Sequence, residues 1–76
     1  MQNILETATS AALSLNLDLS VVRYRAAEKT LEVNLRGGSA NPEDVAWSLA
    51  GRVPAHVEVW GPDGLLALGL CTLCAL

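Results

Sequence analysis

From residue 20 to residue 36, hydrophobic and polar side chains alternate along the chain. Because successive side chains of an extended strand point to opposite faces, this alternation predicts strands with one face on a core and the other toward solvent. A break at residues 26–29 divides the run into the two strands of a hairpin. The side chains expected on the core face are those of Val22, Tyr24, Leu31, Val33 and Leu35, and the other face carries arginines opposite Thr30 and Glu32.

Two segments with helical periodicity flank this hairpin. Residues 3 to about 15 place small and aliphatic side chains in one stripe about 120° wide, since successive residues of a helix turn by about 100°. A second helix begins at Asn41 as N-cap, has Pro42 and two carboxylates in its first turn, and ends before Pro54. The expected buried stripes are Ile4, Leu5, Ala8, Ala11, Ala12 and Leu15 in the first helix, and Val45, Ala46, Leu49, Ala50 and Val53 in the second.

The last third of the chain predicts a second hairpin around residues 61–64. Pro62 suits the second position of a turn, and Gly64 supplies backbone freedom at the fourth. A two-residue loop pairs Trp60 with Leu65, and a regular register then pairs Val59 with Leu66. In this register one face carries Val57, Val59, Leu66, Leu68 and Leu70, and the other carries His56, Glu58, Trp60, Leu65, Ala67, Gly69 and Cys71.

The predicted elements follow the order helix, strand, strand, helix, strand, strand (αββαββ). This order favours an α+β fold, a two-layer sandwich with both helices on one face of a four-stranded antiparallel sheet. The chain has 76 residues, so we expect one small domain over residues 1–76.

Charge and composition exclude several classes of function. The formal net charge is −3 and the arginines are dispersed, whereas binding to a phosphate backbone requires clustered positive charge. The first 20 residues lack the basic start of a secretory signal, and the longest uncharged run, residues 64–76, is too short to span a bilayer. We therefore expect a small acidic cytoplasmic protein with no nucleic-acid and no membrane partner.

The sheet face that carries Trp60 is the first candidate contact surface. Helices on the other face would leave it open, and tryptophan is common among interface anchors. Alternatively, Trp60 folds over Gly69 and covers its own strand. Trp47 lies outside the stripe of its helix, so it is either buried by neighbouring segments or exposed for contact. The candidate protein-binding residues are Trp60, Leu65, Ala67, Leu73, His56, Glu58 and Trp47.

The C-terminal strand, from residue 65 onward, contains no charged side chain. An uncharged strand at the edge of a sheet readily pairs with other chains. It therefore either lies centrally in the sheet or pairs with another molecule, and we expect homodimerisation through this segment.

No catalytic or cofactor-binding motif is evident in the chain. Cys71 and Cys74 have C-x-x-C spacing, but zinc requires four ligands, and residues three apart in a strand point to opposite faces. His56 and Glu58 share a face, as an acid–base pair would, yet no nucleophile or phosphate-binding loop accompanies them. We expect no enzyme, no metal and no cofactor, with the cysteines as small buried side chains in a reducing compartment.

Residues 37–61 contain a Gly-Gly pair, a helix with Ala and Leu, a Pro-Ala turn, a strand with Val and a closing Gly. The residues in this pattern are Gly37, Gly38, Ala46, Leu49, Pro54, Ala55, Val57 and Gly61. The segment resembles part of the Mu-type baseplate J proteins of contractile phage tails. It departs from them by an insertion around residues 41–42, and the chain is far shorter than a baseplate subunit. The resemblance covers about a third of the chain and implies a mobile-element relative of such a domain.

These observations predict a non-enzymatic domain that binds another protein, as an adaptor or as an inhibitor of a cellular protein. The resemblance adds a phage or mobile-element origin. One alternative is a structural component of a phage-tail-like assembly. The other is a small metal-binding or redox protein that uses Cys71 and Cys74.

Overall fold

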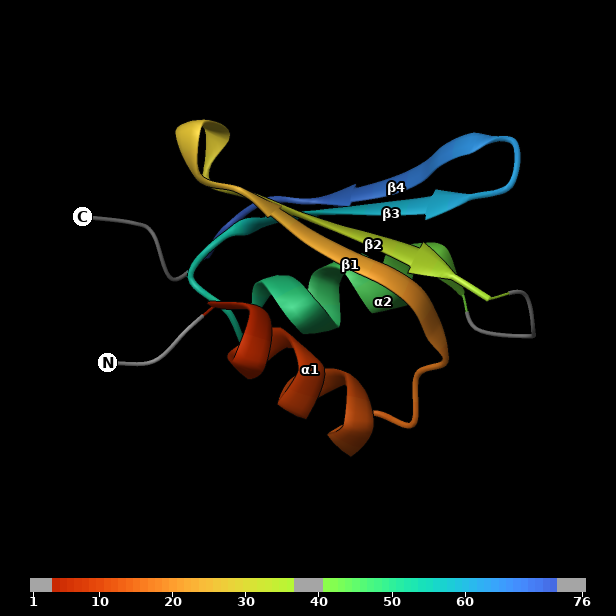
Figure 1. Ribbon diagram of the computed structural model, residues 1–76, viewed down its shortest axis with the longest axis horizontal. Helices are drawn as coiled ribbons and strands as arrows, with labels where there is room; N and C mark the ends of the chain where they lie inside the picture. Colours follow the sequence, from red (N-terminus) through yellow and green to blue (C-terminus); the bar gives the residue numbers. More distant parts are fainter. Residues whose placement is uncertain (1–3, 37–40, 73–76) are drawn as a thin grey trace.

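The computed structural model describes residues 4–36 and 41–72. They form two layers, with both α-helices beneath a four-stranded mixed sheet (Figure 1). The predicted α+β class, with two α-helices on one face of a four-stranded sheet, is confirmed. The elements are α1 (Ile4–Ser14), β1 (Leu19–Arg25), the 3₁₀ turn η1 (Ala26–Glu28), β2 (Thr30–Leu35), α2 (Pro42–Ala50), β3 (His56–Gly61) and β4 (Gly64–Gly69).

The sheet has the strand order β1-β2-β3-β4, and its two hairpins, β1–β2 and β3–β4, are antiparallel as predicted. However, β2 and β3 are parallel, so the prediction of a fully antiparallel sheet is wrong. The connection between β2 and β3 contains α2. This helix packs on the sheet and returns the chain to the end of the sheet where β2 begins, so that β3 runs in the same direction. His56, at the start of β3, therefore lies beside Thr30, at the start of β2.

Local hydrogen bonds define the end of α1 and the start of α2. Asn16 has a positive φ of 57° after α1, and the backbone N–H groups of Asn16 and Leu17 donate to the carbonyls of Leu13 and Ala12 at 3.2 and 2.9 Å. This is a Schellman motif, in which asparagine tolerates the left-handed conformation. At the start of α2, the side-chain oxygen of Asn41 accepts a hydrogen bond of 2.9 Å from the N–H of Glu43, as predicted.

The core lies between the sheet and the two helices. The predicted core face of the first hairpin is confirmed, since Leu31 and Val33 are fully buried and the other three side chains pack against the core. The predicted stripe of α2 is also buried. The buried hydrophobic residues are Ala8, Ala11, Ala12, Leu31, Val33, Val45, Ala46, Leu49, Ala50, Val53, Ala55, Val57 and Val59.

The register predicted for the second hairpin is wrong beyond its first pair. Trp60 pairs with Leu65 as expected, but Val59 pairs with Ala67, so Leu66 is the extra residue of a β-bulge. The bulge exchanges the faces of the residues that follow it. Ala67 packs against the core and Gly69 is buried, while Leu68 pairs with Glu58 on the opposite face.

Close packing of α2 explains why small residues of β4 turn inward. A Cβ atom added at Gly69 would lie 2.5 Å from the backbone oxygen of Ala46. The helix therefore rests directly on the glycine backbone, and there is no space for a leucine at this position. The predicted inward faces of Leu66 and Leu68 required that space.

This contact makes Gly69 sensitive to the smallest substitution. We expect Gly69→Ala to lower the free energy of unfolding by about 1–3 kcal/mol, because the added methyl group must displace α2 from the sheet. Gly51→Ala is the matched control, since its φ is −80° and the nearest atom to the added Cβ is 3.5 Å away. The control should change stability by no more than about 1 kcal/mol. Urea unfolding curves measure both, and equal effects would contradict the close contact.

Candidate functional site

The sheet face turned away from the helices, here called the open face, carries the candidate site. Both α-helices lie on the other side of the sheet (Figure 1). Strand pairing and burial assign side chains from all four strands to the open face. They are Val21, Arg23 and Arg25 from β1, Thr30, Glu32 and Asn34 from β2, His56, Glu58 and Trp60 from β3, and Leu65 and Leu68 from β4.

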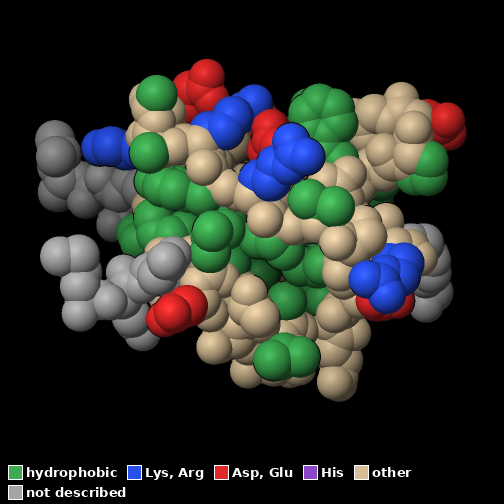
Figure 2. Space-filling view, viewed as in Figure 1, with side chains coloured by type: hydrophobic (Ala, Val, Ile, Leu, Met, Phe, Trp, Pro, Cys, Tyr) green, Lys and Arg blue, Asp and Glu red, His purple; other side chains and the backbone are tan. Residues whose placement is uncertain are grey.

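Arg25 organises the charged part of the open face. Its three guanidinium nitrogens each contact a different carboxylate, those of Glu28, Glu32 and Glu58, at 2.7, 2.8 and 2.9 Å. Parallel pairing places Glu32 beside Glu58, and both side chains are only 18% exposed. One guanidinium between two half-buried carboxylates offsets their mutual repulsion. Figure 2 shows basic and acidic side chains gathered along the upper side of the molecule, over the sheet.

Trp60 is joined to this charged network. Its indole Nε1 donates a hydrogen bond of 3.2 Å to a carboxylate oxygen of Glu58, and its side chain is half-buried. The alternative that Trp60 covers Gly69 is wrong, because Gly69 is buried beneath α2 on the other face. The hydrogen bond to Glu58 favours one orientation of the indole over the sheet.

A hollow of about 370 Å³ lies beside Trp60 on the open face. It extends from β1 to β3 across β2, because β2 separates these strands in the sheet. Within the described part of the chain, Arg23 makes no ion pair, although it pairs with Glu32 across the hairpin. The hollow thus combines an aromatic ring, an aliphatic side chain and a cation available to a ligand. Its lining residues are Ser20, Val21, Arg23, Glu32, Asn34 and Trp60.

Four of the residues predicted for protein binding lie on the open face, namely Trp60, Leu65, His56 and Glu58. The Nδ1 atom of His56 accepts a hydrogen bond of 2.8 Å from the backbone N–H of Cys71, so this ring holds the segment after β4. The predicted face of Ala67 is wrong, because the bulge at Leu66 turns it toward the helices.

The other predicted residues lie elsewhere. Trp47 is exposed, but it belongs to α2 and so to the helix layer rather than to the open face. Leu73 and Cys74 lie outside the described residues. Cys71 is half-buried and disulfide-bonded, which differs from the reduced, buried cysteine that we expected.

Four residues that line the hollow, Val21, Arg23, Glu32 and Asn34, were not predicted as site residues. The alternation of polar and hydrophobic residues predicts that they share one face of the first hairpin. It does not predict the direction of β3, and only the parallel pairing of β2 with β3 brings Asn34 beside Trp60. The pattern within one strand does not indicate which distant strand pairs with it or in which direction.

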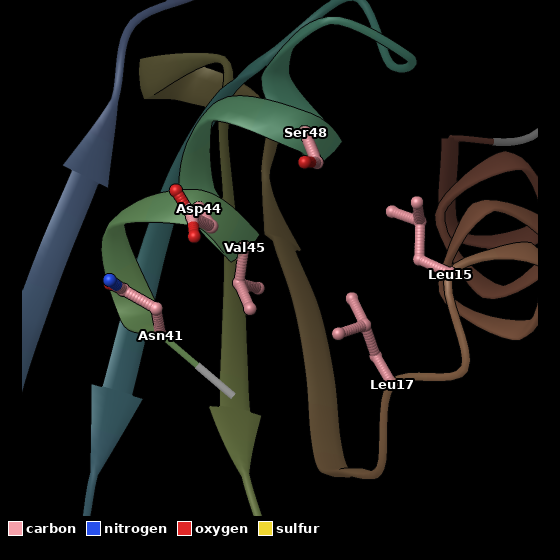
Figure 3. A pocket seen from close by; sticks show the side chains of 6 residues that line it. All are labelled: Leu15, Leu17, Asn41, Asp44, Val45 and Ser48. Atoms are coloured by element: carbon pink, nitrogen blue, oxygen red, sulfur yellow. The ribbon is translucent and has the colours of Figure 1, made fainter. Parts of the chain in front are cut away.

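A second, smaller pocket of about 200 Å³ lies between the end of α1 and the start of α2. Figure 3 shows Leu15 and Leu17 extending toward α2, from which Val45 faces them. Its remaining lining residues are Asn41, Asp44 and Ser48, and the Asn41 side chain is occupied as the helix cap. The pocket is below the size typical of ligand sites, and we interpret it as a packing gap between the helices.

The described residues contain no group of three or more His, Cys, Asp or Glu side chains arranged to hold a metal ion. Among the same residues, neither helix has the length and hydrophobicity that crossing a membrane requires. No protein-family model, curated protein or solved structure matches the chain.

The ion-pair network predicts different effects for two arginines on the same strand. Arg25→Met should lower the free energy of unfolding by about 1–2 kcal/mol, because it leaves the Glu32 and Glu58 carboxylates side by side without a cation. Arg23→Met, which breaks no ion pair, should change it by less than about 0.5 kcal/mol. Adding Glu58→Gln to Arg25→Met should recover part of the loss. Thermal or urea unfolding checks this, and an equal cost for both arginines would contradict the network.

Proposed function

We propose that the chain is a non-enzymatic protein-interaction domain, an adaptor or inhibitor in the cytoplasm, that binds a partner protein on its open face. The observation that carries the proposal is the hollow beside Trp60, with Val21 and Arg23 on its other side. Tryptophan and arginine are the residues most enriched among the energetic anchors of protein interfaces. Here both border one depression in an uncovered sheet face.

The surroundings of the hollow support a protein ligand. Leu65 and Leu68 are about half exposed on the same face, and they extend its apolar surface toward the edge of the sheet. Arg25 and its carboxylates give the face a polar region next to this apolar one. Apolar and charged side chains therefore lie side by side on this face, as they do in protein interfaces.

The chemistry of the hollow indicates what the partner presents. An apolar side chain would fill the space between Trp60 and Val21, and a carboxylate beside it would pair with Arg23. The carboxylates bound by Arg25 repel a second acidic group close by. We therefore propose a partner contact with one apolar residue and one acidic residue next to it.

Affinity capture from the native host tests the proposal, with the full chain as bait. We expect Trp60→Ala to reduce recovery of the bound protein by about tenfold, because anchor residues contribute most of the binding energy. Arg23→Glu should do the same by replacing the cation with a like charge for the partner's carboxylate.

The matched control is Leu13→Ala, which removes a side chain that is 72% exposed on α1, away from the sheet. Its recovery should equal that of the unchanged chain. Circular dichroism confirms that each variant folds. Unchanged recovery with folded Trp60→Ala and Arg23→Glu would refute binding through the open face.

A second candidate function is a structural component of a phage-tail-like assembly, as the resemblance over residues 37–61 implies. The observation that favours it is the uncharged outer strand β4, since such strands promote association of chains. Light scattering after size-exclusion chromatography separates the two candidates. Large oligomers that grow with concentration would favour the assembly component, whereas a discrete species would favour the adaptor or inhibitor.

A further inference from the structure

Exposed hydrophobic side chains and an open strand edge coincide at one side of the molecule. β4 is the last strand in the sheet order, and no described strand pairs with its outer side. It contains no charged residue, whereas the opposite edge strand β1 carries two arginines, a common protection against strand pairing. Four of the eight large hydrophobic residues that are exposed in the described part of the chain belong to β4 or directly follow it, namely Leu65, Leu66, Leu68 and Leu70. An edge of this kind can accept a strand from another molecule.

Trp47 extends this edge into the helix layer. Val45 and Ser48 line the pocket on the side of α2 that faces α1, whereas Ala46 rests on Gly69 of β4. Because each residue of a helix turns by about 100°, Trp47 lies away from α1 and toward the outer side of β4. Its side chain is 56% exposed. An added strand would therefore have leucines beside it on the open face and an indole beside it on the helix side.

Two carboxylates flank the apolar edge at one end. Asp63 lies in the turn that leads into β4, and Glu43 lies four residues before Trp47, on the same side of α2. The end of β2 lies beside the end of β3, so α2 begins at the end of the sheet that carries the β3–β4 turn (Figure 1). Both acidic residues are exposed, and neither forms an ion pair with any residue that the structure describes. A cation at this end of the edge would therefore have two carboxylates to pair with.

We infer that the β4 edge binds an extended segment of another protein, with lysine or arginine where the segment passes Asp63 and Glu43. The segment would add a strand to the sheet, antiparallel to β4, since antiparallel pairing is the slightly more stable arrangement. β4 runs away from the turn that carries Asp63, so an antiparallel segment would run toward this turn. The basic residues of the segment would therefore follow its apolar residues in sequence.

Charge distinguishes this occupant from others that an apolar edge accepts. The chain has a net charge of −3, so it repels a second copy or an acidic segment at long range and attracts a basic one. Asp63 and Glu43 add a local attraction at one end, which favours one direction of the bound segment. This surface is separate from the hollow beside Trp60, which extends from β1 to β3. The inference therefore adds a second contact surface to the one already proposed.

An NMR titration of the ¹⁵N-labelled full chain with a synthetic octapeptide tests the inference. Because β4 has six residues, the peptide has alternating valine and threonine at its first six positions and lysine at the last two, and both of its ends are blocked. We expect shifts of the β4 amide signals and of the Trp47 indole signal, while the signals of α1 stay unchanged. A peptide with the two lysines placed first should bind about fivefold more weakly, because its charges then lie far from the carboxylates. Glutamates in place of the lysines should weaken binding further.

Variants of the chain test the two parts of the surface separately. Asp63→Asn and Glu43→Gln together should abolish the preference for the lysine-last peptide, and each alone should weaken its binding about twofold to threefold. Glu6→Gln is the matched control, because it removes the same charge from an exposed residue of α1 and should leave binding unchanged. Leu68→Lys places a cation on the edge strand and should weaken binding about tenfold or more, whereas Leu13→Lys on α1 should not.

Three results would overturn the inference. The first is no binding of the lysine-last peptide at millimolar concentration. The second is equal affinity for the lysine-last and glutamate-last peptides, or an equal loss of binding in Leu68→Lys and Leu13→Lys. The third is a dimer of the chain alone, seen by sedimentation equilibrium as twice the 8.0 kDa mass, that Leu68→Lys dissociates, because a second copy would then occupy the edge.

Discussion

The contact between Ala46 of α2 and Gly69 of β4 determines which side chains this protein exposes. The helix approaches so closely that a methyl group at Gly69 would collide with the backbone of Ala46. β4 must therefore turn its small residues, Ala67 and Gly69, toward the helix, and the bulge at Leu66 provides the shift that this requires. The leucines of β4 are exposed as a direct consequence of dense packing in the core.

The direction of β3 has a comparable effect on the open face. Its parallel pairing with β2 brings Glu32 beside Glu58 and Asn34 beside Trp60. The two carboxylates can lie together because Arg25 binds both, and Trp60 donates to one of them. Glu58, which Arg25 binds, thus holds the indole that borders the hollow, and the parallel pairing places Asn34 beside that indole.

Local signals in the sequence predict the parts of the fold that depend on neighbouring residues. Alternation predicts the faces of β1 and β2, and Asn41 with Pro42 predicts the start of α2. The faces of β4 were not predictable in this way, since regular alternation puts Leu66 and Leu68 on one face and Ala67 and Gly69 on the other, and both sets are apolar. Hydrophobicity favours buried leucines, but the space between α2 and β4 is large enough only for alanine and glycine. Alternation along β3 predicts that His56, Glu58 and Trp60 share the open face, and the hairpin turn predicts that Leu65 pairs with Trp60. The open-face residues of β1 and β2 join them only through the direction of β3.

The use of leucine in this chain links its packing to its surface. The sequence contains 14 leucines, yet within the described residues only Leu31 and Leu49 are buried, and alanine and valine fill most of the core. A thin core of small side chains lets the helices lie close to the sheet, and it displaces larger side chains to the edge at β4.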